Sequence, residues 1–352
     1  SRGLGDVYKR QVQELTLYTG TYGRKGCTCS CIGCTQESYG RRHKDYQGTI
    51  EQIDTIIEKL PNLKNAYLLG NPDVSVDTEF CNEAAKKFIK SGKKVMFSTS
   101  GINGLEVAKK LTNGIDAKDI NYISYSVDTL DNEKLQFLKG NKNINIEEIN
   151  EAIKYCMDKG ITVKIQPTIW EINQDDYKEI IDFYSKLGIE WFTFHAGSFE
   201  ALQGKDIPIN HVKPEKWIEI VKDLSKIAVK KELKIKAPKI FLSDDEWKKY
   251  KVSNKVYCQN GGKGLQIWMQ EDGLKATFCP VLAEVMPKFI FDLEKEEPVI
   301  LEKQENNCMV CTKCVDGNLK NMSVGGKGKE FILNNQMVHN VCRYYSEKIK
   351  YG

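Results

Sequence analysis

The chain has 352 residues, of which 41% are hydrophobic and 28% are charged, and its net charge is +4 from 52 basic and 48 acidic residues. This length exceeds the ~250–300 residues at which a single core usually stops growing, so we expect one large domain and a smaller one. The near balance of scattered charges argues against a nucleic-acid partner, and because no run of 18 apolar residues occurs we expect no membrane span.

Residues 1–12 lack the apolar stretch of a signal peptide. They resemble a translated sequencing adapter, so we expect a non-native leader there and a true N-terminus that is missing. The chain has twelve cysteines, whereas a secreted disulfide scaffold is usually shorter and carries an export signal, so we expect a cytoplasmic protein. Ten of the cysteines fall in two groups; Cys81 and Cys156 stand alone on helical patterns, where we expect buried thiols.

Short β-like runs alternate with amphipathic helical runs from residue 15 to about 232. We predict strands at 15–19, 65–70, 94–99, 121–127, 162–169 and 191–196. We predict helices near 50–60, 78–91, 104–112, 146–159, 174–187 and 214–232. Six β-α units in a row predict a parallel sheet, and because eight would close a full barrel, we expect an α/β domain at 13–235 with a partial (β/α)6 TIM-like barrel.

Polar residues stand near the ends of four predicted strands, where ligands bind in such folds. Because alternate residues of a strand share a face, Ser124, Ser126 and Asp128 should point one way, and Lys164 and Gln166 should share a face. One such residue can merely cap its strand, but four strand ends beside a cysteine loop predict a site. The residues concerned are Gly70, Asn71, Ser98, Ser100, Ser124, Ser126, Asp128, Lys164 and Gln166.

The loop after the first predicted strand reads GCTCSCIGC, in which Cys27, Cys31 and Cys34 form a C-x3-C-x2-C pattern. Three thiolates can hold three irons of a [4Fe–4S] cluster and leave the fourth iron open. Tetrahedral zinc is the alternative, with Cys29 as the fourth ligand, but Cys27, Cys29 and Cys31 alternate too tightly to converge easily on one ion. We favour the open cluster and interpret Cys29 as a spectator.

This loop, placed within six β-α units, resembles the radical S-adenosylmethionine (SAM) superfamily, and the resemblance spans about 15–235. It implies that Cys27, Cys31 and Cys34 bind the cluster and that SAM chelates the open iron through its amino and carboxylate groups. It further implies that an electron donor such as flavodoxin or ferredoxin reduces the cluster, so that SAM is cleaved to a 5′-deoxyadenosyl radical that abstracts hydrogen from a substrate.

Three further stretches carry the resemblance, with departures. LLGNPDV stands where the family often has Gly-Gly-Glu: Gly70 fits, whereas Asn71 and Pro72 depart. FSTSG and SYSVD resemble the family's Ser-Thr-Asn-Gly and Ser-x-Asp on the third and fourth strands. Gly33 stands where an aromatic residue usually contacts adenine, so that contact must come from elsewhere. The matches imply SAM contacts by Gly70, Asn71, Ser98, Ser100, Ser126 and Asp128, and position alone adds Gln166.

The region 236–352 contains the second group of cysteines, and EDGLKATFCP within it resembles the turn and strand of a SPASM/twitch extension. The resemblance implies one or two auxiliary [4Fe–4S] clusters, and six thiols leave the count open. A structural zinc at CMVCTKC with Cys342 is the alternative. The expected ligands are Cys258, Cys279, Cys308, Cys311, Cys314 and Cys342.

Several function classes stay open at this point. The SPASM-like extension favours a peptide or protein maturase that oxidises, cross-links or epimerises its substrate. The short chain is also compatible with a small-molecule oxidoreductase that acts on a sugar alcohol or a nucleotide. A tRNA-modifying enzyme has little support from the scattered charge. A non-catalytic iron–sulfur module would have no reason to place polar strand ends beside the cluster loop.

His195 is the candidate catalytic residue for the substrate. It ends the sixth predicted strand on the face shared by Trp191 and Thr193, and a neutral imidazole there can take the proton that a substrate radical loses before oxidation. The alternative is a packed histidine that is fixed by a hydrogen bond. Tyr22 and Gln166 are placed in the same cavity by their positions alone.

Overall fold

The computed structural model describes residues 12–20, 27–32, 34, 45–197, 209–210, 212–236, 264–277 and 290–295, and the backbone of short strands at 240–242, 303–304, 307–308 and 320–322. Its contacts divide the chain into two compact units. The first contains Ser1–Ser126, Asp131–Val163 and Gly262–Ile300, and the second contains Val127–Leu130, Lys164–Gly261 and Leu301–Gly352. The domain boundary that the sequence predicts at residue 235 stays a prediction.

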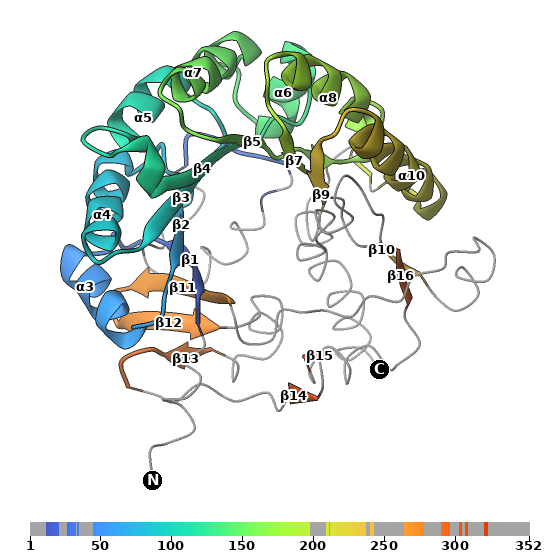
Figure 1. Ribbon diagram of the computed structural model, residues 1–352. Helices are drawn as coiled ribbons and strands as arrows, with labels where there is room; N and C mark the ends of the chain where they lie inside the picture. The colour runs from blue at the N-terminus through green and yellow to red at the C-terminus, as the bar shows by residue number, and fades with distance from the viewer. Residues whose placement is uncertain are drawn as a thin grey trace. The chain divides into compact units, whose positions relative to one another are not determined.

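A mostly parallel sheet forms the core of the first unit. Its strands are β1 (Glu14–Tyr18), β2 (Asn65–Gly70), β3 (Lys94–Thr99), β4 (Ile120–Tyr125), β11 (Gly264–Gln270), β12 (Gly273–Thr277) and β13 (Phe291–Asp292). They lie in the order β13-β12-β11-β1-β2-β3-β4 (Figure 1). The first four confirm predicted strands, whereas β11 pairs in parallel with β1 and so extends the sheet with residues from the predicted C-terminal region. The α/β class with a mostly parallel sheet is therefore confirmed.

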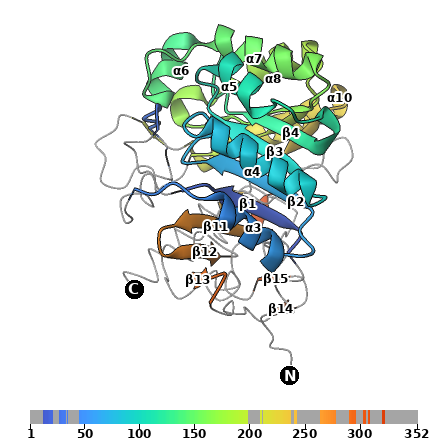
Figure 2. The same ribbon diagram turned by 90° about the vertical axis from the view of Figure 1, so that its left-hand side faces the viewer.

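Helices α3 (Ile50–Lys59), α4 (Thr78–Lys90), α5 (Gly104–Leu111) and α7 (Ile146–Asp158) lie along one face of this sheet (Figures 1 and 2). The start of α3 shows why the sequence folds this way. Thr49 and Gln52 form a reciprocal capping box, and Ile53 and Ile56 on the inner face of the helix are fully buried. The predicted 3.6-residue periodicity thus gives the observed helix.

Helix α6 (Asn132–Lys139) was not predicted from the sequence. The carboxylate of Asp131 accepts a hydrogen bond from the backbone N–H of Lys134 at its start, 2.8 Å away, and Gly140 ends it with a left-handed φ of 58°. Both ends therefore carry ordinary capping signals, which the sequence prediction overlooked.

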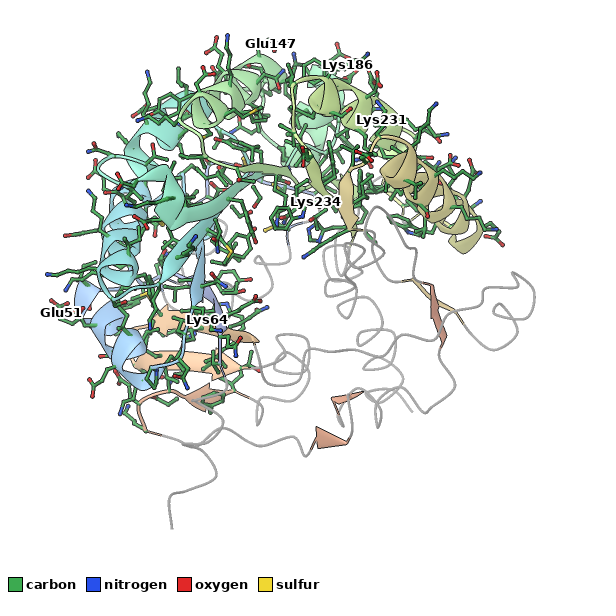
Figure 3. All side chains as sticks on the ribbon, in the orientation of Figure 1. Glu51, Lys64, Glu147, Lys186, Lys231 and Lys234 are labelled. Atoms are coloured by element: carbon green, nitrogen blue, oxygen red, sulfur yellow. The ribbon has the colours of Figure 1, made fainter. Side chains whose placement is uncertain are left out.

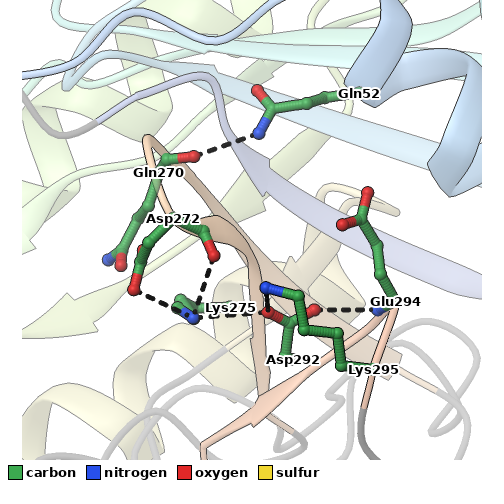
Figure 4. Close-up of polar contacts among 7 residues, drawn as sticks. All are labelled: Gln52, Gln270, Asp272, Lys275, Asp292, Glu294 and Lys295. Carbon is green, nitrogen blue, oxygen red and sulfur yellow. Dashed lines mark hydrogen bonds and ion pairs between the residues drawn. The ribbon is translucent and has the colours of Figure 1, made fainter.

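Polar contacts hold β11, β12 and β13 together and connect them to α3 (Figure 4). The Gln52 side chain donates to the backbone carbonyl of Gln270 at 3.1 Å. The Lys275 ammonium lies 3.4 Å from a carboxylate oxygen of Asp292, whose side chain is 5% exposed. Asp292 also accepts a hydrogen bond from the backbone N–H of Glu294 at 3.0 Å. These contacts make the three strands an integral part of the first unit.

The second unit contains three neighbouring parallel strands. They are β5 (Val163–Ile165), β7 (Trp191–Thr193) and β9 (Lys234–Lys236). The first residue of β5, Val163, is still assigned to the first unit. Strand β6 (Thr168–Ile169) pairs with β8 (His195–Ala196), and the helices are α8 (Tyr177–Lys186) and α10 (Pro214–Lys230). Short antiparallel pairs join β10 (Ile240–Leu242) to β16 (Lys320–Met322) and β14 (Lys303–Gln304) to β15 (Asn307–Cys308).

The predicted strands at 162–169 and 191–196 are each split in two. Pro167 lies at the first break, and proline has no N–H to donate to a strand ladder. The chain instead resumes pairing where the N–H of His195 donates to the Pro167 carbonyl at 2.9 Å. Within the described strands, the predicted alternation can therefore be followed only over Val163–Ile165 and Trp191–Thr193.

Charged side chains such as Glu51, Glu147 and Lys186 project from the outer helices of their own units (Figure 3). Among the described helices, none combines the length and the apolar composition that a membrane span requires.

Candidate functional site

The cysteine loop, residues 27–34, is anchored to the C-terminal end of α6. The backbone N–H of Ser30 donates to the Lys139 carbonyl and that of Ile32 to the Leu138 carbonyl, both at 3.0 Å. The Asn141 side chain donates to the Thr28 carbonyl at 2.7 Å. These three bonds fix the backbone around the thiols, so the unpredicted helix is what positions the loop.

Gly140 is required for this approach. A Cβ at this position would lie 2.2 Å from the carbonyl oxygen of Ser30, a distance that real side chains do not show. Its φ of 58° also lies in the left-handed region, where a side chain is strained. Gly140 therefore both ends α6 and allows the backbone of Ser30 to approach closely.

The four cysteines of the loop differ in their surroundings. Cys29 is 3% exposed, and its Sγ donates to Ser100 Oγ at 3.6 Å, whereas Cys27, Cys31 and Cys34 are half-buried. A hydrogen bond with Cys27, together with burial, raises the pKa of the Cys29 thiol to about 11. Cys29 therefore differs from the other three cysteines in its burial and in its contact with Ser100. None of the six cysteines with described side chains forms a disulfide.

The three half-buried thiols fit an iron–sulfur cluster by the chemistry of the donor set. Within the described part of the chain, no three His, Cys, Asp or Glu side chains gather as they would around a single metal ion. Each thiolate of a cluster binds a different iron, so a cluster does not require the thiols to meet at one point. A tetrahedral zinc site, by contrast, needs four converging ligands.

Asp73 organises the strand ends beside the loop. Its carboxylate accepts hydrogen bonds from the backbone N–H of Ser100 at 2.7 Å, from Thr99 Oγ1 at 3.2 Å and from the backbone N–H of Ser75 at 2.9 Å. It thus ties the turn after β2 to the end of β3. Asp73 was not singled out from the sequence, although it lies within the quoted LLGNPDV stretch.

Two predicted residues lie in the turn that Asp73 organises. Gly70 has a φ of 75°, which a residue with a side chain rarely adopts. Asn71 is 1% exposed and donates through its side chain to the Tyr46 carbonyl at 3.0 Å. The turn therefore depends on glycine for its backbone and on Asn71 for its attachment to the residues before α3.

Asp77 is a half-buried carboxylate in the first unit. It accepts hydrogen bonds from Thr19 Oγ1, from the Gln47 side chain at 3.2 Å and from the thiol of Cys81 at 3.3 Å. Burial raises the pKa of Asp77 above its ordinary value. Cys81 and Cys156 are both fully buried, which confirms the prediction of buried thiols.

The prediction that Ser124, Ser126 and Asp128 share one face of a strand is wrong, because β4 ends at Tyr125. Ser124 is fully buried and donates to the Phe97 carbonyl at 3.1 Å. Ser98 is its partner in register on β3. Asp128, in the second unit, accepts a hydrogen bond from the backbone N–H of Thr168 at 2.7 Å. Ser126 and Asp128 therefore lie after the end of β4, where the alternation of a strand no longer applies.

Ser126 is contacted by Lys139, which sequence reasoning missed. The Lys139 ammonium donates to Ser126 Oγ at 2.7 Å, and the lysine is 4% exposed although its carbonyl anchors the cysteine loop. Lys139 therefore anchors the cysteine loop through its backbone and contacts Ser126 through its buried side chain. The only signal in the sequence is a lysine directly before the helix-ending glycine, where lysines also occur merely to complement the helix dipole.

In the second unit, Gln166 and His195 are half-buried, and His195 is the partner of Thr168 in register. Lys164, on β5, is 2% exposed. Tyr22, Gly33, Cys258, Cys279, Cys311, Cys314 and Cys342 lie outside the described residues. Cys308 belongs to β15, of which only the backbone is described. The predicted ligands of the auxiliary clusters therefore stay predictions.

One family model matches part of the chain. Residues 24–184 match the model of the Radical SAM superfamily, and this stretch contains the cysteine loop and β2 to β5. An uncharacterized protein of Methanocaldococcus jannaschii, MJ0103, is 25% identical over 173 residues, which are 46% of this chain and 39% of that protein. The chain thus matches well under half of the length of this relative.

Solved structures resemble the fold. SuiB of Streptococcus suis bound to S-adenosylmethionine is 15% identical with a TM-score of 0.57, and the match covers 87% of this chain and 70% of SuiB. The structure of anSMEcpe with bound AdoMet is 13% identical with a TM-score of 0.59, and the match covers 97% of this chain and 93% of that one. At these identities the likeness shows the fold alone.

Proposed function

We propose that this chain, whose residues 24–184 match the Radical SAM superfamily, is an enzyme that cleaves SAM reductively with a [4Fe–4S] cluster on Cys27, Cys31 and Cys34. The observation that carries the proposal is the division among the four thiols. Cys29 is turned into the protein against Ser100, and the three cysteines of the C-x3-C-x2-C pattern are left half-buried on an anchored loop. Three thiols at this spacing can ligate three irons of a [4Fe–4S] cluster and leave the fourth iron open, which supports the proposal.

When bound, such a cluster supplies the electron that breaks the C5′–S bond of SAM. The chain's own residues position the loop and the cofactor. The end of α6 fixes the loop, Asp73 fixes the ends of β2 and β3, and Lys139 places a positive charge on Ser126. The proposed SAM contacts are Gly70, Asn71, Ser98, Ser100, Ser126, Asp128 and Gln166, to which we add Lys139.

Anaerobic reconstitution with iron and sulfide tests the proposal. We expect about two [4Fe–4S] clusters per chain, one on the loop and at least one on the cysteines from Cys258 to Cys342. Iron and sulfide analysis with Mössbauer spectroscopy counts the clusters. A preparation with stoichiometric zinc and about four irons or fewer would contradict it.

The Lys139→Met variant is expected to bind SAM about tenfold or more weakly, because a buried ammonium beside Ser126 is suited to the carboxylate of SAM and methionine has a similar length without the charge. Equilibrium dialysis of labelled SAM against the reconstituted protein measures this affinity. Lys142→Met, at an exposed position three residues away, is the matched control and should bind SAM as the wild type does. If both variants bound SAM with equal affinity, Lys139 would not be a SAM contact.

For the substrate, we propose a peptide or protein, with the enzyme as a maturase that oxidises, cross-links or epimerises it. SuiB has been solved with its precursor peptide SuiA, and anSMEcpe with AdoMet and the Kp18Cys peptide. These two folds match most of the present chain, which supports a peptide substrate. A small-molecule oxidoreductase is the second candidate, and a flavodoxin or ferredoxin is the proposed electron donor for both.

We propose His195 as the residue that takes a proton from the substrate radical. Its side chain is half-buried on β8, and its backbone is fixed by the bond to the Pro167 carbonyl. In the His195→Ala variant, SAM cleavage without product is expected to persist while product formation falls about 100-fold or more. Quantifying 5′-deoxyadenosine and product separately measures both. An unchanged product yield would make His195 structural, and a loss of SAM cleavage would assign it to SAM.

A further inference from the structure

Strands β5, β7 and β9 of the second unit present two different faces. On one face, Ile165, Phe192 and Ile235 are partners in register and are all fully buried. Helix α10 packs on β9. This face therefore forms the ordinary apolar core of the unit, and nothing about it calls for a ligand.

The opposite face has lysines where a core would have apolar residues. Lys164 is the partner of Trp191, and Trp191 is the partner of Lys234, so the three share this face. Lys236, two residues beyond Lys234, lies on the same face. Figure 3 shows Lys234 on the inner side of these strands, whereas Lys231 lies among the outer helices. The chain thus places three lysines around one tryptophan.

Two of these lysines approach the same aromatic ring. The ammonium of Lys164 lies 5.5 Å from the centre of the Trp191 ring, and the ammonium of Lys236 lies 5.8 Å from it. Each contact is a favourable cation–π interaction, but two like charges on one ring also repel each other. Lys164 is 2% exposed, and burial, together with the charge of Lys236, lowers its pKa well below the ordinary value. Keeping a lysine here therefore costs stability.

Thr193 is the second, independent observation on this face. It lies two residues beyond Trp191 on β7 and is the partner of Lys236 in register. It is fully buried, and among the described residues its Oγ1 has no hydrogen-bond partner. Because a buried hydroxyl without a hydrogen bond is costly, Oγ1 is positioned to serve a group that comes from outside the chain.

We propose that Lys164, Lys236 and Thr193 form a binding site for a carboxylate, with Trp191 contacting the apolar part of the molecule that carries it. A carboxylate would accept hydrogen bonds from both ammonium groups and from the Thr193 hydroxyl, and would relieve the repulsion between the lysines. A carboxylate suits this buried position better than a phosphate dianion, because removing a dianion from water costs more than removing a monoanion. The further step, that the carboxylate belongs to the substrate, rests on the proposed function.

The test is equilibrium dialysis of the full, reconstituted chain with two labelled probes of nearly identical shape. N-acetyl-L-glutamate 1-amide carries one carboxylate, and N-acetyl-L-glutaminamide carries a neutral amide in its place. We expect the charged probe to bind about tenfold or more tightly than the neutral one. Lys164→Met should abolish the preference for the charged probe, and Thr193→Val should reduce it. Lys222→Met, at an exposed position of α10 in the same unit, is the matched control and should keep it.

The outcomes separate this site from the proposed function. Lys164→Met should melt no lower than the wild type, because it removes a buried charge, so a loss of binding in a stable variant supports the site. Equal affinity for the two probes, an unchanged preference in Lys164→Met, or stronger competition by inorganic phosphate than by acetate would overturn it. A wild type that prefers the charged probe but never cleaves SAM would instead overturn the proposed function and leave the carboxylate site standing.

Discussion

Replacing Cys27, Cys31 or Cys34 with alanine is expected to abolish the formation of 5′-deoxyadenosine from SAM and to remove about four irons per chain. Each of these thiols is half-buried. In the proposed site each is one of three protein ligands, so the loss of any one would leave the cluster with two. Dithionite-driven assays with quantified 5′-deoxyadenosine measure the first effect, and iron analysis measures the second. The auxiliary clusters that we propose on the C-terminal cysteines should remain in all three variants.

Cys29→Ala is the matched control, because it removes a thiol from the same loop. Cys29 is buried against Ser100 and holds a raised pKa, so we expect this variant to keep its iron and most of its activity. The loss of one small buried thiol should lower the free energy of unfolding by about 1 kcal/mol. If Cys29→Ala were inactive while one of the other three variants kept its activity, the assignment of the ligands would be wrong.

Gly140→Ala is expected to impair both cluster binding and SAM cleavage, although it changes no group that touches the cluster. The added methyl group would collide with the Ser30 carbonyl, so either the end of α6 or the cysteine loop must move. A misplaced loop should hold its cluster poorly, and 5′-deoxyadenosine formation should fall by about tenfold or more, which corresponds to about 1.4 kcal/mol. Iron content after reconstitution and the rate of SAM cleavage are the two readouts.

Gly160→Ala separates the collision from backbone strain. Gly160 has a φ of 76°, close to the left-handed value at Gly140, but a Cβ there would meet nothing within 4 Å. Both variants therefore carry a strain of about 1 kcal/mol, and only Gly140→Ala carries the clash. Gly160→Ala should lose stability without losing iron. Equal iron content in the two variants would show that the loop does not depend on Gly140.

Much of the fold could be predicted because the alternation of β and α runs is strong. The predicted strands at 65–70 and 94–99 match β2 and β3, and the five isoleucines and leucines at 50–60 give a helix with a buried face. The sequence could not show that Gly264–Gln270 pairs with β1, because pairing between segments about 250 residues apart leaves no local pattern. Pro167 did carry a local signal for the split of the fifth strand.

The candidate site divides in the same way. The spacing of Cys27, Cys31 and Cys34 is a local pattern and could be read directly. The different surroundings of Cys29 depend on its contact with Ser100, 71 positions along the chain, and only the fold reveals them. Asp73 and Lys139 were missed for the same reason, since each acts on residues of another element.

The central claim is that Cys27, Cys31 and Cys34 hold a [4Fe–4S] cluster whose open iron binds SAM. Electron–nuclear double resonance of the reduced protein, with SAM labelled with 15N at its amino group, tests this contact directly. We predict a 15N hyperfine coupling to the cluster in the wild type and in Cys29→Ala, and none in Cys27→Ala. A fully reconstituted wild-type protein that shows no such coupling at saturating SAM would contradict the account.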